Sequence, residues 1–437
     1  MNKEKTAFSI ASEHLKKYAV TYLFIAMSVF FIMVSGLDMN YVVSQLFQRL
    51  NRNAFIVLAL IIPIIAGMGI NFAITIGAMA AQIGLLLTIN WGVTGYKGIL
   101  LAAAITLPLA SFFGFLIGKL LNKMKGQETI GSMILGYFAN GAYQLLFLFI
   151  FGNIIPLNEN VTIVGGTGVQ NTLNLTGKVG LYTAIDGIWR VSFTDALYVV
   201  LGLLVVIATL MYIFNKISQE KYIVAALVIA LIFAAYQVPV INNVFTGRLS
   251  GRKAISVPVV TWAIIACLCA FNAFIMKTRL GQKFRAVGQN RVVANAAGIN
   301  VDRTRIIAIM ISTVLAGWGQ IMFMQSEGIG TFQTYAAHEQ VGLYAGAAIL
   351  VGGASIDRAT NIQALIGTFL FHSLFITAQN AASNLFGDAT VGEYFRAFLS
   401  YGVIAVALVI YSWRSAQTRK GGGKLRAEGE RAAKAVK

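Results

Sequence analysis

The sequence predicts an all-α fold: a polytopic transmembrane helical bundle of about 10–12 spans, with a possible parallel internal repeat. Apolar residues make up 57% of the chain and charged residues only 11%, whereas a soluble domain carries about 25% charged residues. The apolar residues come in blocks of roughly 17–25, the length that crosses about 30 Å of hydrocarbon as a helix. Lys and Arg are also distributed unequally between the segments that connect these blocks.

Twelve apolar blocks are candidate spans, with boundaries good to a few residues. They are 18–36, 54–69, 72–90, 98–121, 130–151, 193–214, 222–239, 258–276, 306–325, 340–353, 361–380 and 394–413. The tenth is short and rich in glycine, which is typical of a broken or re-entrant span. We interpret 18–413 as one transmembrane domain.

Charge placement orients the spans if the N-terminus is cytoplasmic. The inside segments are then 1–17, 122–129 with Lys119, 215–221, 277–305, 354–360 and 414–437. They carry 25 of the 34 Lys and Arg and 8 of the 16 Asp and Glu, and the outside segments carry the other 9 and 8. This positive-inside pattern accounts for nearly all of the net charge of +18, so a nucleic-acid partner is not needed to explain it. Both termini are expected in the cytoplasm of a bacterial inner-membrane protein.

Three segments lie outside the predicted spans and have their own character. Residues 1–17 read as a cytoplasmic amphipathic helix with Phe8, Ala11 and Leu15 on one stripe. Residues 152–192 form an external insertion, rich in Asn, Thr and Gly, that either contacts a partner or covers the mouth of the bundle. Residues 414–437 form a basic cytoplasmic tail.

A weak repeat is visible in the layout. In each half, a cytoplasmic segment precedes an outgoing and an incoming span, and a glycine-bearing interruption follows at 67–71 and again at 352–357. Both copies run in the same direction. Transporters are often built from such duplications, with the path between the halves. Chance similarity remains the alternative, because residue identity between the copies is poor.

The sequence lacks the motifs of an enzyme. No G-x-x-x-x-G-K-[ST] loop is present, so we expect no ATP bound by this chain. The histidines (His14, His338, His372) are far apart in sequence, and Cys267 and Cys269 point apart on one helix. We therefore expect no metal site, no bound cofactor and no catalytic residue.

Carboxylates are also missing from the interiors of the predicted spans. Asp195, Glu327, Glu339 and Glu393 all fall at span edges. Ion-coupled transporters usually need an intramembrane carboxylate. A transporter without one must take its energy from a separate ATPase, although a secondary transporter with backbone sodium sites stays open.

Uncharged polar residues do occur inside the spans. The candidates for a translocation path are Asn71, Gln82, Asn140, Gln144 and Gln320, together with Gly352 and Gly353 of the second interruption. Amide side chains exchange hydrogen bonds with a neutral polyhydroxy solute without trapping it. The alternative for each is an interhelical hydrogen bond, and the small pairs Gly114/Gly118 and Gly342/Gly346 indicate close helix packing.

The most specific segment is the predicted cytoplasmic loop 277–305. It has a basic stretch from Arg279, a Gly288–Asn290 turn, and then one short helix that stops at Gly298. A short exposed helix between two spans is suited to docking a soluble protein and transmitting its movement.

This loop resembles the coupling loop of permease subunits of bacterial ABC importers for monosaccharides, whose pattern is approximately R-x-G-x-x-x-x-A-V-G-x-N-x-x-A-A-x-x-x-G-I. The matching residues are Arg279, Gly281, Ala286, Val287, Gly288, Asn290, Ala294, Gly298 and Ile299. The stretch 351–355 is similar to the family's V-L-G-G-T-S, and 67–71 to a degraded G-G-I-D-L. The chain departs from the pattern at Arg291-Val292, where the family often has Pro-Glu, and in its longer insertion and extra spans at 193–239.

The resemblance implies a dimer of permeases, identical or related, around a central path. Two ATPase subunits holding ATP and Mg would dock on the cytoplasmic side, and an external solute-binding protein would deliver the cargo. Arg285 to Ile299 would carry the coupling. A monosaccharide is the expected cargo, with a nucleoside or flavin as the alternative.

Overall fold

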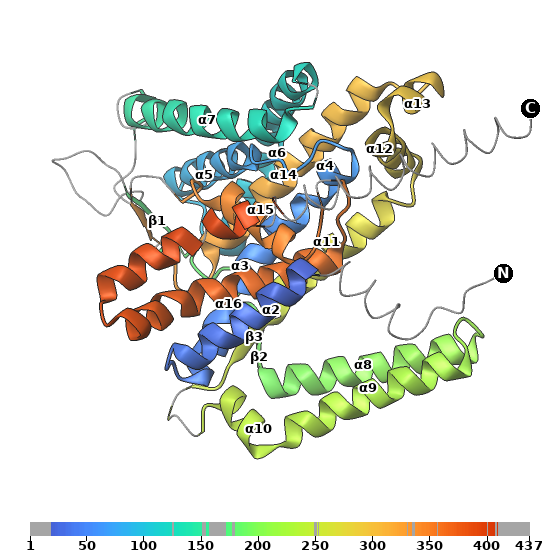
Figure 1. Ribbon diagram of the computed structural model, residues 1–437. Coiled ribbons are helices and arrows are strands. Elements are labelled where there is room, and N and C mark those ends of the chain that lie inside the picture. Colours follow the sequence, from blue (N-terminus) through green and yellow to red (C-terminus); the bar gives the residue numbers. More distant parts are fainter. Residues whose placement is uncertain are drawn as a thin grey trace, which may run out of the picture.

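The protein is an all-α helical bundle, as predicted (Figure 1). The computed structural model describes residues 19–124, 126–150, 154–156, 172–176, 180–248, 251, 253–329, 331–333, 337–355, 357–399, 401–406 and 409. Six helical segments in these ranges are long and apolar enough to cross a membrane, and three shorter apolar helices accompany them. The chain is thus a multi-pass membrane protein. The predicted segments 1–17 and 414–437 lie outside the described residues.

A helix occupies every one of the predicted apolar blocks, at least in part. The helices are α2 (Ala19–Val34), α3 (Met39–Ala59), α4 (Ile61–Ile65), α5 (Ile74–Asn90), α6 (Gly95–Lys123), α7 (Glu128–Ile150), α8 (Phe193–Ile213), α9 (Gln219–Gln237), α10 (Pro239–Thr246), α11 (Val259–Ile275), α12 (Arg279–Gln289), α13 (Arg291–Ala296), α14 (Val301–Gln325), α15 (Val341–Val351) and α16 (Asn361–Phe386). Further helical residues cover 389–399 and 401–406. The strands are β1 (Thr172–Asn174), β2 (Arg190–Ser192), β3 (Ser256–Pro258) and β4 (Thr331–Gln333).

The centre of the bundle is formed by α5, α6 and α14, which pack against one another. A Cβ atom added to Gly114 or Gly118 of α6 would lie 2.8 or 2.9 Å from the Cα atom of Met310 or Ile306 in α14. Such separations are too short for a side chain. The predicted close packing at Gly114 and Gly118 is therefore confirmed.

A second group of helices surrounds α16, which packs against α2, α3 and α15. The predicted pair Gly342 and Gly346 on α15 is also confirmed as a packing contact, because an added Cβ on either would lie 2.7 Å from Phe72. Helix α15 has 11 residues, so it rises only about 16 Å. It cannot cross about 30 Å of hydrocarbon alone, which agrees with the predicted broken span.

One predicted boundary is wrong. The second span begins not at 54 but at the start of α3, where the Asp38 side chain accepts a hydrogen bond from the Asn40 amide. Averaged hydropathy misses the first half of α3 because this half contains charged residues. The predicted spans therefore leave Arg49 and Arg52 in an external loop between 36 and 54. The helix nevertheless buries an apolar face that recurs every four residues. That face is Val42, Leu46 and Leu50.

Helices α8 and α9 form a hairpin that lies beside the bundle (Figure 1). Only 6% of the membrane-length window of either helix is buried. Large apolar side chains point outward all along it, as Leu203 and Leu231 do. A helix that is apolar on all sides and unpacked is suited to contact with lipid. The hairpin joins the bundle at one end, where the Phe193 ring stacks on Phe245 and contacts Phe47 of α3.

The described part of the predicted external insertion packs on the end of α14. Strand β1 pairs antiparallel with β4, which follows α14. Leu181 and Ile185 are buried, and the Gln325 side chain at the end of α14 accepts a hydrogen bond from the Ile185 amide. This part of the insertion therefore covers the bundle, while contact with a partner stays a prediction.

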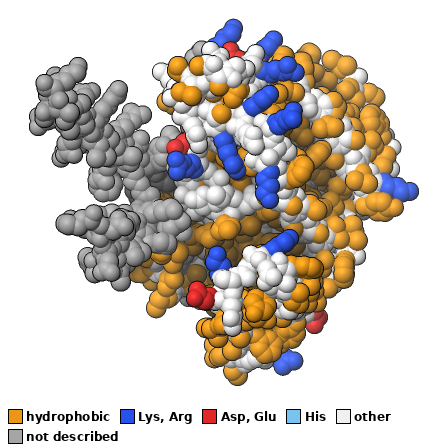
Figure 2. All heavy atoms as spheres, turned by 90° about the vertical axis from the view of Figure 1, so that its right-hand side faces the viewer, with side chains coloured by type: hydrophobic (Ala, Val, Ile, Leu, Met, Phe, Trp, Pro, Cys, Tyr) orange, Lys and Arg blue, Asp and Glu red, His pale blue; other side chains and the backbone are white. Residues whose placement is uncertain are grey.

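Lys and Arg gather on the face that carries α12 and α13. Figure 2 shows this face with many basic side chains and few acidic ones. It is the face predicted to be cytoplasmic from the positive-inside pattern.

Candidate coupling surface and translocation path

The segment between α11 and α14 forms two helices that meet at Asn290. The chain turns by 74° between α11 and α12, and the Thr278 hydroxyl caps α12 by accepting a hydrogen bond from the Gly281 amide. The Asn290 side chain caps α13 by accepting from the amides of Val292 and Val293. The sequence predicts a single short helix here, and this is corrected: the basic stretch is itself helical, because it buries an apolar face.

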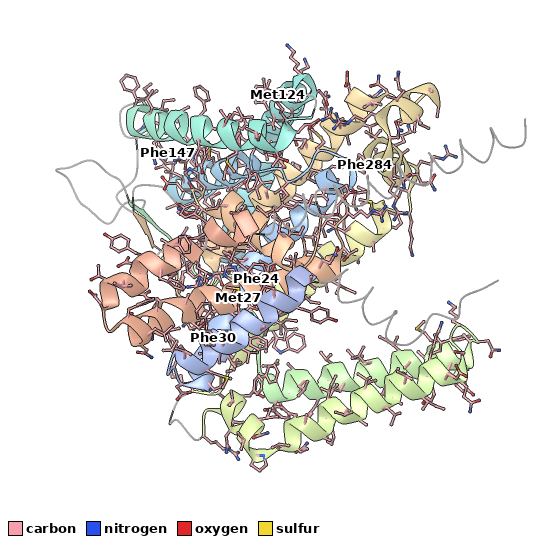
Figure 3. The ribbon with its side chains drawn as sticks, viewed as in Figure 1. Phe24, Met27, Phe30, Met124, Phe147 and Phe284 are labelled. Atoms are coloured by element: carbon pink, nitrogen blue, oxygen red, sulfur yellow. The ribbon has the colours of Figure 1, made fainter. Side chains whose placement is uncertain are left out.

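The two helices present different faces. Phe284 and Val287 of α12 are buried, and Figure 3 shows Phe284 on the side of α12 toward the bundle. Arg285 is exposed. On α13, Val292 is 79% exposed and Val293 is 62% exposed. Both side chains are therefore accessible on the basic face, and docking of another protein at this place stays a prediction.

The predicted stop of α13 at Gly298 is confirmed to within two residues. The last helical residue is Ala296, and Gly298 adopts a left-handed φ of +79°. The Ile299 amide then donates to the Ala294 carbonyl at 3.0 Å. This arrangement ends a helix sharply and sends the chain into α14.

Helix α12 lies directly on the first glycine turn, which we define as 67–71 between α4 and α5. A Cβ on Gly288 would overlap the Ile65 carbonyl, and a Cβ on Gly67 would lie 2.7 Å from the Cα of Gly288. Arg291 adds a hydrogen bond of 2.9 Å to the Gly67 carbonyl. The two backbones therefore touch with no side chain between them, so a displacement of α12 must displace the turn.

Glu128, the first residue of α7, joins three elements. Its Oε1 atom lies 2.7 Å from Nη2 of Arg291 and also accepts a hydrogen bond from Arg305 of α14. The Arg305 side chain is fully buried and that of Glu128 is 7% exposed. At the position where the chain departs from the family pattern, Arg291 thus turns inward and ties α13 to α7 and to the first glycine turn.

Four of the seven predicted path residues come together around the 337–339 segment, although they come from three separate blocks of the sequence. His338, just before α15, is fully buried. Its Nδ1 atom lies 3.0 Å from Oε1 of Gln82 in α5, and its Nε2 atom lies 2.7 Å from Oδ1 of Asn140 in α7. The Tyr143 hydroxyl donates to the same Gln82 oxygen at 2.7 Å.

Glu339 extends this polar cluster toward the surface. Its Oε1 atom accepts hydrogen bonds from Gln144 at 2.8 Å and from Asn140 at 3.3 Å. Gln320 of α14 donates to the carbonyl of Ala337, next to His338, while its own Oε1 is buried without a partner. A cavity of about 130 Å³ adjoins the cluster between α5, α7 and α15.

The other predicted path residues lie elsewhere. Asn71 belongs to the first glycine turn, where its oxygen accepts from the Ala73 amide and its Nδ2 is buried without a partner. Gly352 and Gly353 form the second glycine turn (352–357, with 356 not described) at the contact of α15 with α16. A Cβ on Gly352 would overlap the Gln363 carbonyl. Their role in a path stays a prediction.

Sequence reasoning missed several residues of these sites. Glu128 carried no signal, because its partners are distant in sequence. His338 was seen only as one isolated histidine. Arg49 and Arg52 line a second cavity on the other side of the 337–345 segment. The four-residue apolar repeat of α3 could have placed both arginines on a helix.

Comparison with known proteins gives one family match. Residues 42–411 match the family described as "Branched-chain amino acid transport system / permease component". No solved structure matches the chain.

Curated relatives are similar over part of the chain. The autoinducer 2 import system permease protein of Klebsiella pneumoniae is 32% identical over 138 residues, which cover 32% of this chain and 38% of the relative. The L-arabinose transport system permease protein of Escherichia coli is 27% identical over 35% of this chain and 44% of the relative. A nucleoside ABC transporter permease protein of Lactococcus lactis is 27% identical over 40% of this chain and 50% of the relative. The matched segments thus span about half of these relatives or less.

Proposed function

The chain belongs to the family described as the branched-chain amino acid transport system permease component, and from that premise we propose that it is the transmembrane permease subunit of an ATP-binding-cassette importer for a monosaccharide. The observation that carries the proposal is the contact of the α12–α13 segment with the first glycine turn. It joins an exposed apolar docking surface to the ends of helices that enter the bundle.

The coupling follows from this geometry. An ATPase that binds Val292 and Val293 would move α13 and α12 together, because Asn290 is both the C-cap of α12 and the N-cap of α13. Gly288 passes the movement to α4 and α5 through Gly67. Glu128 passes it to α7 and α14. Movement of one half against the other would give alternating access.

The polar cluster supplies groups for the cargo. The amides of Gln82, Asn140 and Gln144 converge on the 338–339 segment and on the cavity beside it. Hydrogen bonds from amides can be exchanged for those of sugar hydroxyls at little net cost, because each replaces a similar bond.

The remaining assignments follow from the proposed class. The permease breaks no covalent bond and binds no cofactor, and ATP and Mg are held by the partner ATPase. Its partners are ATPase subunits, a second permease and an external solute-binding protein. It lies in the bacterial inner membrane with both termini in the cytoplasm. A nucleoside is the second candidate cargo, because a nucleoside permease is among the relatives.

The proposal can be tested by co-purification from the native host. We expect the wild-type chain to recover an ATPase subunit, and the double variant Val292→Asp, Val293→Asp to lose it while keeping its membrane level. Val240→Asp is the matched control, since Val240 is 71% exposed on α10, at the other end of the bundle. Equal recovery by both variants would show that α13 is not the docking surface.

Transport in liposomes tests the class itself. We expect uptake of the cargo only when the ATPase and ATP are present. Full uptake by the chain alone, driven by an ion gradient, would contradict the importer assignment and leave a secondary transporter.

A further inference from the structure

A second cavity, of about 230 Å³, lies between α3, α14, α15 and α16. Arg49 and Arg52 line it from α3. Residues three apart share one face of a helix, so both guanidinium groups reach the same space. Gly328 and Ile329, in the segment after α14, line the end toward the predicted external face.

These arginines have no acidic partner among the residues that the structure describes. No Asp or Glu lines the cavity, and neither arginine forms an ion pair there. Arg52 is only 8% exposed, and the Nε atom of Arg49 is buried without a hydrogen bond. Their ring contacts, Arg49 with Phe375 at 4.7 Å and Arg52 with Phe323 at 5.9 Å, are weak substitutes for a counter-ion.

Two like charges held together in a buried space are unfavourable unless an anion joins them. The rest of the lining fits an anion with polar substituents. His372 is 2% exposed and its Nδ1 has no hydrogen-bond partner. Asn53, Gln340 and Tyr344 add neutral hydrogen-bonding groups at the same cavity.

We infer that Arg49 and Arg52 bind the acidic group of the transported solute, so that the cargo is a sugar carrying a carboxylate or a phosphate instead of a neutral sugar or nucleoside. This deepens the proposed function and rests on it. Guanidinium forks match carboxylate and phosphate oxygens in pairs, which gives geometric selectivity as well as charge.

The test is thermal unfolding of the full chain in phosphatidylcholine nanodiscs, titrated with galacturonate and ribose 5-phosphate. Galactose and ribose are the matched neutral probes, and acetate and inorganic phosphate are the minimal anions. We expect the anions to raise the unfolding temperature and the neutral sugars to leave it unchanged. Arg52→Gln and Arg49→Gln should each weaken the anion response about 10- to 100-fold. Arg190→Gln is the control, because Arg190 is a partly exposed arginine paired with Glu327.

The variants should fold, because each removes an uncompensated buried charge. Their unfolding temperature without anion is expected to equal or exceed that of the wild type. A response to anions that survives in both variants, or no response to any anion, would overturn the inference. So would a response given by phosphatidylglycerol in the nanodisc and by no soluble anion, since that would assign the cavity to a lipid headgroup.

Reconstituted transport separates this inference from the proposed function. ATP-dependent uptake of a neutral sugar that Arg52→Gln leaves unchanged would retain the importer and reject the acidic cargo. Anion binding that depends on Arg52, in a chain whose uptake needs no ATPase, would retain the acidic cargo and reject the importer.

Discussion

The two glycine turns, which the sequence presents as counterparts in a repeat, are held in different ways. The first is covered by α12: the backbone of Gly288 rests on Gly67, and Arg291 ties that turn to Glu128. The second is held by its own half, because Gly352 packs on the carbonyl of Gln363 and the Gln363 side chain donates to the carbonyl of Gly353 at 2.8 Å. Similar turns therefore have different neighbours. Under the proposed coupling the first would receive movement from outside the bundle, whereas the second fixes α15 to α16.

The largest expected effect on stability comes from removing the Glu128 carboxylate, which pairs with Arg291 and Arg305 beside the first turn. Glu128→Ala leaves Arg305 buried without its counter-ion, so we expect a loss of about 3–5 kcal/mol in the free energy of unfolding. Glu327→Ala, which breaks the partly exposed pair with Arg190, should cost no more than about 1 kcal/mol. Denaturant unfolding in detergent measures both. Equal losses would mean that the Glu128 contacts are not a buried network.

An intermediate effect comes from adding one methyl group to either turn. Gly288→Ala and Gly352→Ala both force a Cβ against a backbone carbonyl, and each should cost about 1–3 kcal/mol. Only Gly288→Ala should also reduce ATP-coupled transport per folded molecule. Gly202→Ala, in open space on α8, is the control and should be neutral or stabilising. If Gly352→Ala uncoupled transport as strongly, the two turns would be equivalent.

The smallest expected effect comes from removing one helix cap beside each glycine turn. Asn290 caps α13 beside the first turn, and Thr360 caps α16 after the second. Alanine at either position should cost about 0.5–2 kcal/mol. Recovery of the ATPase by co-purification should fall with Asn290→Ala alone, because only that cap orients Val292 and Val293. A similar fall with Thr360→Ala would place docking on both turns.

Much of the fold could be predicted from the sequence because membrane spans and close packing leave local signals. Every predicted apolar block contains helical residues, and Gly114 and Gly118 marked the contact of α6 with α14. The start of α3 could not be found by hydropathy, since Arg49 and Arg52 reduce the average even though a cavity inside the bundle accommodates them.

The candidate site was predicted in part. Gln82, Asn140 and Gln144 were chosen for their chemistry, and the structure brings them together because α5 and α7 both face the segment that precedes α15. The contact between Gly288 and Gly67 joins two segments that are far apart in the chain, so no local sequence pattern could predict it. Glu128 was hidden for the same reason.

The position of α14 at the centre has a consequence for how the chain is assembled during synthesis. The hairpin α8–α9 is formed by neighbouring segments, so it can enter the bilayer as a finished unit as soon as it is made. Helices α3, α5 and α6 leave the ribosome earlier, yet their common contact is α14, which follows them by a long stretch of chain. Gly77, Gly114 and Gly118 face α14, so these glycines have no partner helix until α14 has been synthesised. The packing of the first half can therefore be completed only after synthesis of the second half has begun.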